Sequence, residues 1–265
     1  MRPNRVKRAL KEGKPQVGTW LSLGSLCAAR FLARSGFDWL NIDIEHSMVG
    51  METTTAMMAA IADAGCPVLA RVPSNRHDHI KRVLDNGAHG VVVPMVNSRA
   101  EAEAAVSACL YPPAGTRSVG GNQHALNFDT TAAEYYVRAN DEILIVLQCE
   151  HIDAVHRADE IFSVPGIDAI FVGPNDLAAS MRSRDGRSPS PEATREAMQH
   201  ILATCRKHGV AAGVHTFSAQ EARLRMDEGW QFIAINSDLK MLLDGATAIL
   251  RELGGDRLRS ELARY

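Results

Sequence analysis

The chain has 265 residues, of which 46% are hydrophobic and 23% are charged, and its formal net charge is −2. These values are typical of a globular protein with a sizeable core and exclude a largely disordered chain. Because the charge is close to neutral and the Arg and Lys residues are scattered, a small-molecule partner is favoured over nucleic acid or an acidic membrane.

The N-terminus and the cysteines bear on the compartment. Residues 1–10 are basic but lack the apolar stretch of a secretory signal, and no apolar run is long enough to cross a membrane. The cysteines are odd in number, widely spaced, surrounded by apolar residues and without a CxxC pair, and they are Cys27, Cys66, Cys109, Cys149 and Cys205. We therefore expect reduced core thiols in a cytoplasmic protein.

One pattern recurs along the chain: a helical stretch stops at a glycine, and a short β-rich run begins one to three residues later. Glycine supplies the left-handed residue that ends a helix. The glycines are Gly36, Gly65, Gly87, Gly166, Gly209 and Gly229. Two further runs, Gly18–Leu23 and Glu142–Gln148, bring the expected strands to eight, each followed by a helical segment.

Eight alternating strand and helix units in a chain of this length predict a single-domain (β/α)8 TIM barrel over residues 1–265. An open doubly wound sheet is the alternative for the same alternation, although neither a G-x-G-x-x-G nor a Walker A motif favours it. Two connections are long, Leu110–Thr130 and Ala178–Pro191, and residues 131–140 look helical. Long loops in compact folds are usually functional or mobile.

Polar residues cluster where the expected strands end, which is where barrel enzymes build their active sites. These residues are Asp43, Glu45, His46, Arg71, Gln148, Glu150, Asn175, Asp176, Asn236 and Asp238. Because residues two apart on a strand share a face, Gln148 and Glu150 should point together while Cys149 packs away from them.

Glu150 and Asp176 follow neighbouring strands, and an inward carboxylate needs a compensating charge. A shared divalent cation is the simplest compensation, and two carboxylates plus waters suit Mg²⁺ or Mn²⁺. Three alternatives stay open: Glu150 forms a structural ion pair with Arg71, Asp176 only caps the helix that begins at Leu177, or His46 only caps a turn.

Lysine chemistry is disfavoured. An imine-forming lysine has to sit inside the barrel, and none of the six lysines ends an expected strand. His124 in the long loop and His215 after the seventh strand are weak candidates for substrate contact.

Several segments are distinctive together, and in order they resemble the pyruvate-dependent class II aldolases of the HpcH/HpaI family, the 4-hydroxy-2-oxoheptanedioate and 2-dehydro-3-deoxy-sugar-acid aldolase group. The resemblance runs from about residue 17 to 240. The segments are Gly36–His46, Ala70–Pro73, Leu84–Val96, Tyr111–Arg117, Gln148–Glu150 and Phe171–Leu177.

The resemblance implies reversible cleavage of a 4-hydroxy-2-oxo acid into pyruvate and an aldehyde, with a divalent metal (Mg²⁺ or Mn²⁺, and Co²⁺ as a further candidate). It implies that Glu150 and Asp176 bind the metal and that Arg71 stabilises the enolate. It also implies that His46 is the base. It implies further that Asp85 raises the basicity of His46 by reaching it across a subunit contact. It further implies substrate contacts from Gln148 and from the backbone of Asn175 and Asp176.

Relatives also suggest a homohexamer in which the C-terminal helix, residues 237–253, is exchanged between subunits. The resemblance implies that the 118–130 loop helps to select the aldehyde, and because this loop departs from the family pattern, the aldehyde stays open. Two other functions are kept in view. A CoA-thioester lyase of the citrate-lyase branch would need a basic patch, for which only the Arg182–Arg187 loop is available. A barrel that binds a keto acid without catalysis would need no base.

Overall fold

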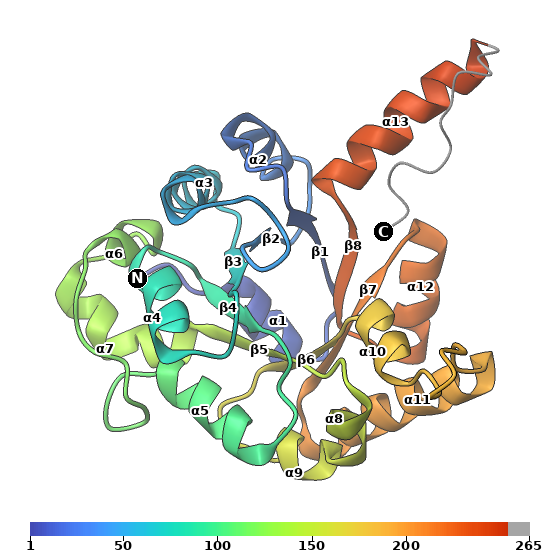
Figure 1. The fold of residues 1–265 in the computed structure, drawn as a ribbon. Coiled ribbons are helices and arrows are strands. Elements are labelled where there is room, and N and C mark those ends of the chain that lie inside the picture. The colour runs from blue at the N-terminus through green and yellow to red at the C-terminus, as the bar shows by residue number, and fades with distance from the viewer. Residues whose placement is uncertain (254–265) are drawn as a thin grey trace.

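Eight parallel strands close into a barrel surrounded by helices in the computed structural model, which describes residues 1–253 (Figure 1). Each strand pairs with the next, and β8 pairs with β1. The expected TIM barrel is confirmed, and the closed ring excludes the open sheet. The strands are β1 (Gln16–Leu21), β2 (Trp39–Asp43), β3 (Val68–Arg71), β4 (Gly90–Val93), β5 (Leu144–Gln148), β6 (Ala169–Val172), β7 (Ala211–Thr216) and β8 (Phe232–Ser237).

Helices follow every strand. They are α1 (Arg5–Lys11), α2 (Leu26–Leu32), α3 (Met51–Asp63), α4 (His77–Asp85), α5 (Arg99–Cys109), α6 (Gln123–Asn127), α7 (Ala132–Glu142), α8 (Ile152–His156), α9 (Ala158–Phe162), α10 (Pro174–Ser180), α11 (Pro191–His208), α12 (Ala219–Glu228) and α13 (Asp238–Glu252). Residues 254–265, the end of the expected 1–265 domain, lie outside the described residues.

Most expected boundaries hold within two residues. Gly209 and Gly229 end α11 and α12 in the left-handed conformation, as predicted. Two strands have limits that differ from the expected ones by two residues. The first strand ends at Leu21 rather than Leu23, because the backbone N–H groups of Ser22 and Leu23 donate to Asp238 instead of continuing a ladder. The fifth strand begins after Glu142 rather than at it. Glu142 is the last residue of α7, and its carboxylate accepts hydrogen bonds from the Asn4 backbone N–H and from Arg8.

The alternation of side chains separates two cores. On β7, Ala212 and Val214 face the helices, whereas Ala211 belongs to the inner core of the barrel. His215 shares the inward face of Ala211, because side chains two apart point the same way. The same rule places Trp20, Phe171 and Arg71 inside the barrel near its C-terminal end.

Helix α1 covers the opposite end of the barrel, and its helical character was not anticipated. Val6 and Leu10 join the inner core, and Asn4 caps the helix. Lys7 is buried beside Asp168, with 3.0 Å between Nζ and Oδ2. Lys7 is therefore engaged in a structural ion pair at the N-terminal end of the barrel. This end lies opposite the C-terminal strand ends, where barrel enzymes build their active sites.

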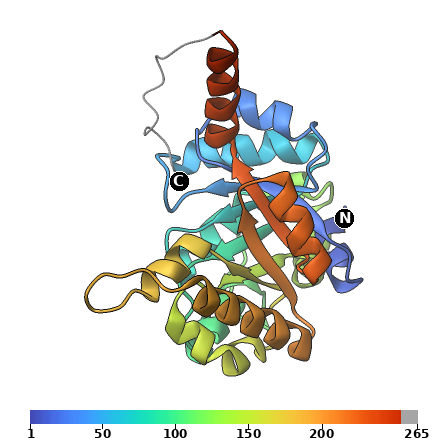
Figure 2. The same ribbon diagram turned by 90° about the vertical axis from the view of Figure 1, so that its right-hand side faces the viewer.

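Helix α13 projects away from the barrel rather than packing along it (Figures 1 and 2). Its exposed apolar residues include Leu239, Leu242, Ile249 and Leu250. No described helix is long and apolar enough to cross a membrane.

The cysteines confirm the sequence interpretation with one exception. Cys66, Cys109, Cys149 and Cys205 are buried and unpaired. Cys27 is exposed, so the expectation of a core thiol was wrong there. It lies on α2 beside Leu26 and Arg30, which are also exposed, on the outer side of the helix.

Candidate active site

A cavity of about 400 Å³ opens at the C-terminal ends of the strands. His46, Arg71, Gln148, Asn175 and Asp176 line it, so five of the predicted site residues meet there. The cavity is also lined by Trp20, Ser22, Leu23, Asp43, Ser47, Met48, Phe171, Gly173, Pro174, His215, Phe217, Asn236, Ser237, Leu239, Lys240 and Leu243.

Glu150 and Asp176 converge over Gly173. A Cβ atom at position 173 would lie 2.7 Å from Glu150 Oε2 and 3.4 Å from Asp176 Oδ2. Any side chain at this position would therefore crowd the Glu150 carboxylate, and glycine does not. No group of three or more His, Cys, Asp or Glu side chains suited to a metal occurs within residues 1–253. The donor set fits a hard cation that takes its other ligands from water or substrate oxygens.

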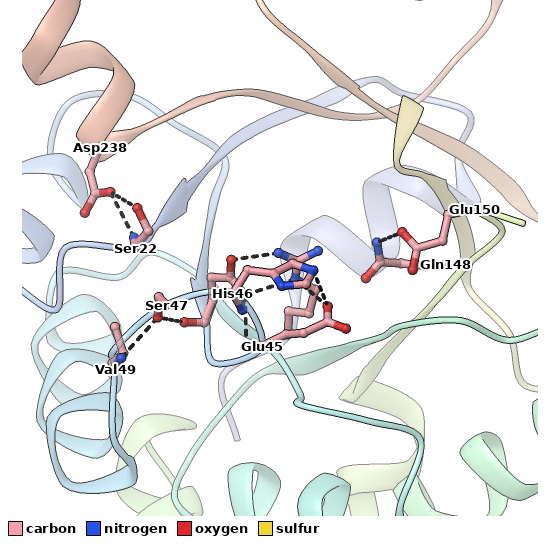
Figure 3. Close-up of polar contacts among 10 residues, drawn as sticks. Ser22, Glu45, His46, Ser47, Val49, Gln148, Glu150 and Asp238 are labelled. Atoms are coloured by element: carbon pink, nitrogen blue, oxygen red, sulfur yellow. Dashed lines mark hydrogen bonds and ion pairs between the residues drawn. The ribbon is translucent and has the colours of Figure 1, made fainter. Parts of the chain in front are cut away.

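Glu150 is buried and held in place from two sides. Its Oε1 accepts from the Met95 backbone N–H at 3.0 Å, and its Oε2 accepts from Gln148 Nε2 at 2.6 Å (Figure 3). Burial raises the pKa of Glu150 to about 7, the Met95 hydrogen bond opposes that shift, and the charge of Asp176 adds to it. A carboxylate in this position gains from a nearby cation. Gln148 and Glu150 point together, as expected.

Asp176 does not cap a helix, so that alternative role is excluded. Helix α10 begins at Pro174, and its N-cap is Gly173, without a side-chain capping bond. Asp176 lies in the first turn of that helix, and its carboxylate is therefore available to the cavity. The helix begins three residues earlier than expected because Pro174 is favoured at a first helical position.

Arg71 is fixed by two acidic residues from the end of β2. Its Nε and Nη2 donate to Asp43 at 3.0 and 2.7 Å, and Glu45 lies 3.3 Å from Nε. The guanidinium also lies 4.5 Å from the centre of the Trp20 ring. Burial alone would lower the pKa of Arg71, but Asp43 and then Glu45 outweigh it and raise the pKa. The alternative ion pair of Arg71 with Glu150 is not formed.

His46 follows β2 at the edge of the cavity, and about half of its side chain is exposed (52%). Its Nε2 lies 3.7 Å from Glu45 Oε2, and its backbone N–H donates to Asp43. The imidazole caps no turn, so that alternative is excluded. Figure 3 shows His46 and Glu45 side by side, with Gln148 and Glu150 across the barrel mouth.

Asp85 does not meet His46 within one chain. It ends α4, and barrel helices return toward the N-terminal ends of the strands, opposite the cavity. There Oδ1 accepts from Arg117 Nη2 at 2.8 Å and Nε at 3.2 Å. A cross-subunit role for Asp85 stays a prediction.

The 118–130 loop also lies away from the cavity of its own chain. His124, a weak candidate for substrate contact, is instead buried against Tyr135, with ring centres 4.0 Å apart. A Cβ at Gly121 would lie 3.6 Å from the Cβ of Asp85. The loop and Asp85 therefore form one surface, and the expectation that the loop selects the aldehyde is not met within a single chain.

A family model matches residues 16–245 and is described as HpcH/HpaI aldolase/citrate lyase. The chain belongs to this family. A hydroxypyruvate/pyruvate aldolase of Sagittula stellata is 38% identical and covers 92% of this chain and 96% of its own. A 4-hydroxy-2-oxo-heptane-1,7-dioate aldolase of Escherichia coli is 36% identical and covers 95% of each chain. The crystal structure of a family member from Burkholderia cenocepacia J2315 has a TM-score of 0.87 and 32% identity, over 95% of this chain and all of that one.

These relatives confirm the resemblance inferred from the segments, and with it the enzyme class, since aldolases are carbon–carbon lyases. Neither the CoA-thioester lyase nor the non-catalytic barrel is favoured by them. In the Arg182–Arg187 loop, Arg187 is moreover paired with Asp185, with 2.7 Å between Nε and Oδ2.

Sequence reasoning missed several residues of this family member's cavity. Asp43 was noted as a strand end, but its bidentate contact with Arg71 was not. Trp20 and Phe171 were treated as strand residues, although period-two counting from Ser22 and Gly173 places both on the inner face. Asp238 was expected at the end of the eighth strand, but it begins α13 and accepts from Ser22 (Figure 3).

Lys240 qualifies the argument against lysine chemistry. It lines the cavity from the first turn of α13, although it does not end a strand. Its Nζ is 2.6 Å from Asp244 Oδ2, so the Lys240 side chain is engaged in an ion pair on α13. A Schiff-base role therefore gains no support.

Proposed function

We propose that this chain is a metal-dependent pyruvate aldolase that cleaves a 4-hydroxy-2-oxo acid reversibly into pyruvate and an aldehyde. The observation that carries the proposal is the convergence of Glu150 and Asp176 over Gly173, beside the cavity that Asp176, Gly173, Arg71 and His46 line. The names of the relatives from Sagittula stellata and Escherichia coli support the same reaction class.

Glu150 and Asp176 would hold the cation, and Mg²⁺, Mn²⁺ and Co²⁺ all accept such oxygen ligands. When bound, the cation supplies Lewis acidity at the keto oxygen of the substrate. Gln148 anchors Glu150 through its amide N–H, while its Oε1 is buried without a partner among the described residues. Gln148 and Asn175 are therefore the substrate contacts that we propose beside the carboxylates.

Arg71 is proposed to stabilise the charge that develops during cleavage. When the C3–C4 bond breaks, its electron pair moves to the keto oxygen and forms the enolate of pyruvate. Donors that are already oriented stabilise such a charge best. Asp43, Glu45 and Trp20 orient the Arg71 guanidinium before substrate arrives.

His46 is proposed as the base that takes the proton of the C4 hydroxyl, so that the C4–O bond becomes the carbonyl of the departing aldehyde. Histidine suits this role because its ordinary pKa is near neutrality. In the reverse direction the same groups remove a proton from the methyl group of pyruvate to form the enolate, and the imidazole returns a proton to the new C4 alkoxide.

Proton exchange tests the proposal without knowledge of the aldehyde. In deuterated water, the purified protein with Mg²⁺, Mn²⁺ or Co²⁺ should exchange the methyl protons of pyruvate, followed by proton NMR. Chelation with EDTA should stop the exchange, and restored cation should restart it. Absence of exchange with all three cations would contradict the proposal.

We further propose that α13, as residues 237–253, packs on or exchanges with a neighbouring copy, in a homohexamer by family resemblance. The projecting helix and the exposed Leu242 and Ile249 support it (Figure 2). Asp85 and the 118–130 loop form one surface, so a single neighbour could bring both to a cavity. Light scattering of Leu242→Glu against the unaltered protein tests this, and an unchanged mass would contradict it.

A cytoplasmic location is likewise proposed. The four buried, unpaired thiols support it, since disulfides are rare in a reducing compartment.

A further inference from the structure

The wall of the cavity that faces the proposed cation ligands is apolar. Glu150 follows β5 and Asp176 follows β6, and in the closed ring of strands these positions lie opposite β1 and β2. Four apolar side chains from the segments after β1, β2 and β8 line the cavity on that side, and we call them the apolar wall: Leu23, Met48, Leu239 and Leu243. Leu23, Met48 and Leu239 are exposed, so an apolar group that covered them would be stabilised.

The proposed reaction places one part of the substrate against the apolar wall. Glu150 and Asp176 are the proposed ligands at the pyruvate end, and His46, across the barrel mouth, is the proposed base at C4 (Figure 3). The chain beyond C4 therefore extends away from the two carboxylates. Met48 lies two residues after His46, and the cavity of about 400 Å³ has room for more than pyruvate.

The hydroxyl groups beside the apolar wall are engaged within the chain. Ser22 Oγ donates to Asp238 Oδ1 at 3.1 Å (Figure 3). Ser47 Oγ donates to the backbone carbonyl of Asp43, and Ser237 Oγ caps the first turn of α13. Each of these hydroxyls already has a partner, and none of them offers a charge to a substrate carboxylate.

Positive charge is scarce on the same side. Lys240 is the only lysine or arginine there among the described residues that line the cavity, and its Nζ lies 2.6 Å from Asp244 Oδ2. His215, on neighbouring β7, is neutral, because burial and then the charge of Arg71 lower its pKa to about 4. A carboxylate on the substrate chain would lose water here without gaining an unpaired cation, which is costly, whereas an alkyl chain gains from the same burial.

We propose that the enzyme acts on 4-hydroxy-2-oxo acids whose chain beyond C4 is uncharged and apolar, so that the aldehyde it releases is an apolar one. The inference rests on the proposed aldolase function. The apolar wall is the specificity-determining surface, and the ion pair between Lys240 and Asp244 keeps Lys240 from binding a terminal carboxylate.

Two substrates that differ at the end of the chain test the inference. The chain of 4-hydroxy-2-oxooctanoate ends in an alkyl group, whereas that of 4-hydroxy-2-oxoheptanedioate ends in a carboxylate. Both release pyruvate, which lactate dehydrogenase detects. With Mn²⁺, the kcat/KM of the unaltered enzyme should be higher for the octanoate by about tenfold or more. Equal values, or a higher value for the heptanedioate, would overturn the inference.

Asp244→Asn tests the part that charge plays, because it leaves Lys240 without its carboxylate partner. The ratio of kcat/KM for the heptanedioate to that for the octanoate should rise by about tenfold. Asp159→Asn is the matched control, because it alters an exposed ion pair with Lys207 away from the cavity, and its ratio should equal that of the unaltered enzyme. A ratio that does not rise in Asp244→Asn would overturn the inference.

Leu239→Ala tests the apolar wall itself. Its kcat/KM for the octanoate should fall by about tenfold relative to its rate of pyruvate methyl-proton exchange, because less apolar surface meets the substrate chain. An unchanged quotient would overturn the inference, as would a lower mass of this variant in light scattering, which would assign Leu239 to a contact between copies. Absence of methyl-proton exchange in the unaltered enzyme would overturn the proposed function and this inference with it, whereas exchange without preference for the octanoate would overturn the inference alone.

Discussion

Asp43 holds Arg71 through two hydrogen bonds, Nε to Oδ1 at 3.0 Å and Nη2 to Oδ2 at 2.7 Å. This bidentate contact fixes the plane of a guanidinium that is largely buried above Trp20. The two residues are paired in register on neighbouring strands, Asp43 on β2 and Arg71 on β3. The orientation of the proposed enolate-binding group is therefore built into the strand pairing of the barrel.

Asp43→Asn should lower kcat by about 10- to 100-fold with a smaller change in KM, because an amide cannot accept both hydrogen bonds and Arg71 is then less well oriented in the transition state. Pyruvate release from 4-hydroxy-2-oxoheptanedioate, coupled to lactate dehydrogenase, measures it. Asp78→Asn, which alters an exposed pair with Arg76, is the control. An unchanged kcat in Asp43→Asn would show that Arg71 needs no such support.

Gly173→Ala should weaken cation binding by about 10- to 100-fold, because the new Cβ would lie 2.7 Å from Glu150 Oε2 and displace that proposed ligand. Titration calorimetry with Mn²⁺ measures the affinity. Gly245→Ala serves as control, since a Cβ there meets nothing within 4 Å. Equal affinities in the two variants would exclude Glu150 and Asp176 as the binding pair.

The barrel and the position of the site were predictable because both follow from local rules. Helix-ending glycines followed by short apolar runs define the strands, and parallel strands of a closed barrel bring Arg71, Gln148, Glu150 and Asp176 to one mouth. The alternation of side chains along a strand also correctly predicted that Gln148 and Glu150 point to the same side. It likewise predicted that Cys149 points the opposite way, into the core between the strands and the helices.

Other features depend on partners far apart in the sequence and leave no local signal. Asp238 begins α13 because its carboxylate accepts from Ser22 and Leu23, more than 200 residues earlier. The placement of His124 against Tyr135 depends on how the long loop folds back on α7. The burial of four cysteines followed from apolar context, whereas Cys27 shows that such context also occurs on the exposed side of a short helix.

His89 makes stability depend on pH. Burial lowers its pKa from 6.5 to about 4, and its Nδ1 accepts from Val68 N–H, so the folded chain holds it neutral. The unfolded chain binds this proton below about pH 6.5, whereas the folded chain binds it only below about pH 4, so stability falls as the pH falls between these values. From pH 7.5 to 5.0 the loss should be about 2 kcal/mol.

Urea unfolding at the two pH values measures that loss, and the comparison with His89→Gln isolates it. Glutamine can accept from Val68 and donate to Asn127, yet it does not titrate. The variant should therefore lose about 2 kcal/mol less stability on acidification. Equal pH dependence in both proteins would mean that His89 is already protonated, or accessible to water, in the folded chain.

Asp85→Asn should destabilise the chain by about 3 kcal/mol, because it leaves the charge of Arg117 without its acidic partner. The Arg117 side chain is fully buried, packs 4.5 Å from the centre of the Tyr111 ring, and donates twice to Asp85. Urea unfolding at pH 7.5 measures the change, with Asp129→Asn as control for an exposed pair. The pH dependence of kcat/KM gives a second measurement on Asp85→Asn. A shift of its acidic limb, at pH values where the variant is still folded, would support the predicted link of Asp85 to His46 in a neighbouring copy.

His46→Ala separates an enzyme from a barrel that only binds a keto acid. If His46 accepts the C4 hydroxyl proton, its loss should lower the kcat of cleavage by about 100-fold or more, the usual contribution of a general base. The imidazole is half exposed, and within residues 1–253 its one ion pair is with Glu45, so folding should be unaffected. Binding of the pyruvate analogue oxalate with Mn²⁺, measured by calorimetry, should persist because Arg71, Glu150 and Asp176 are intact. Equal cleavage rates in His46→Ala and in the control His200→Ala would remove His46 from the reaction, whereas loss of oxalate binding alone would make it a ligand contact.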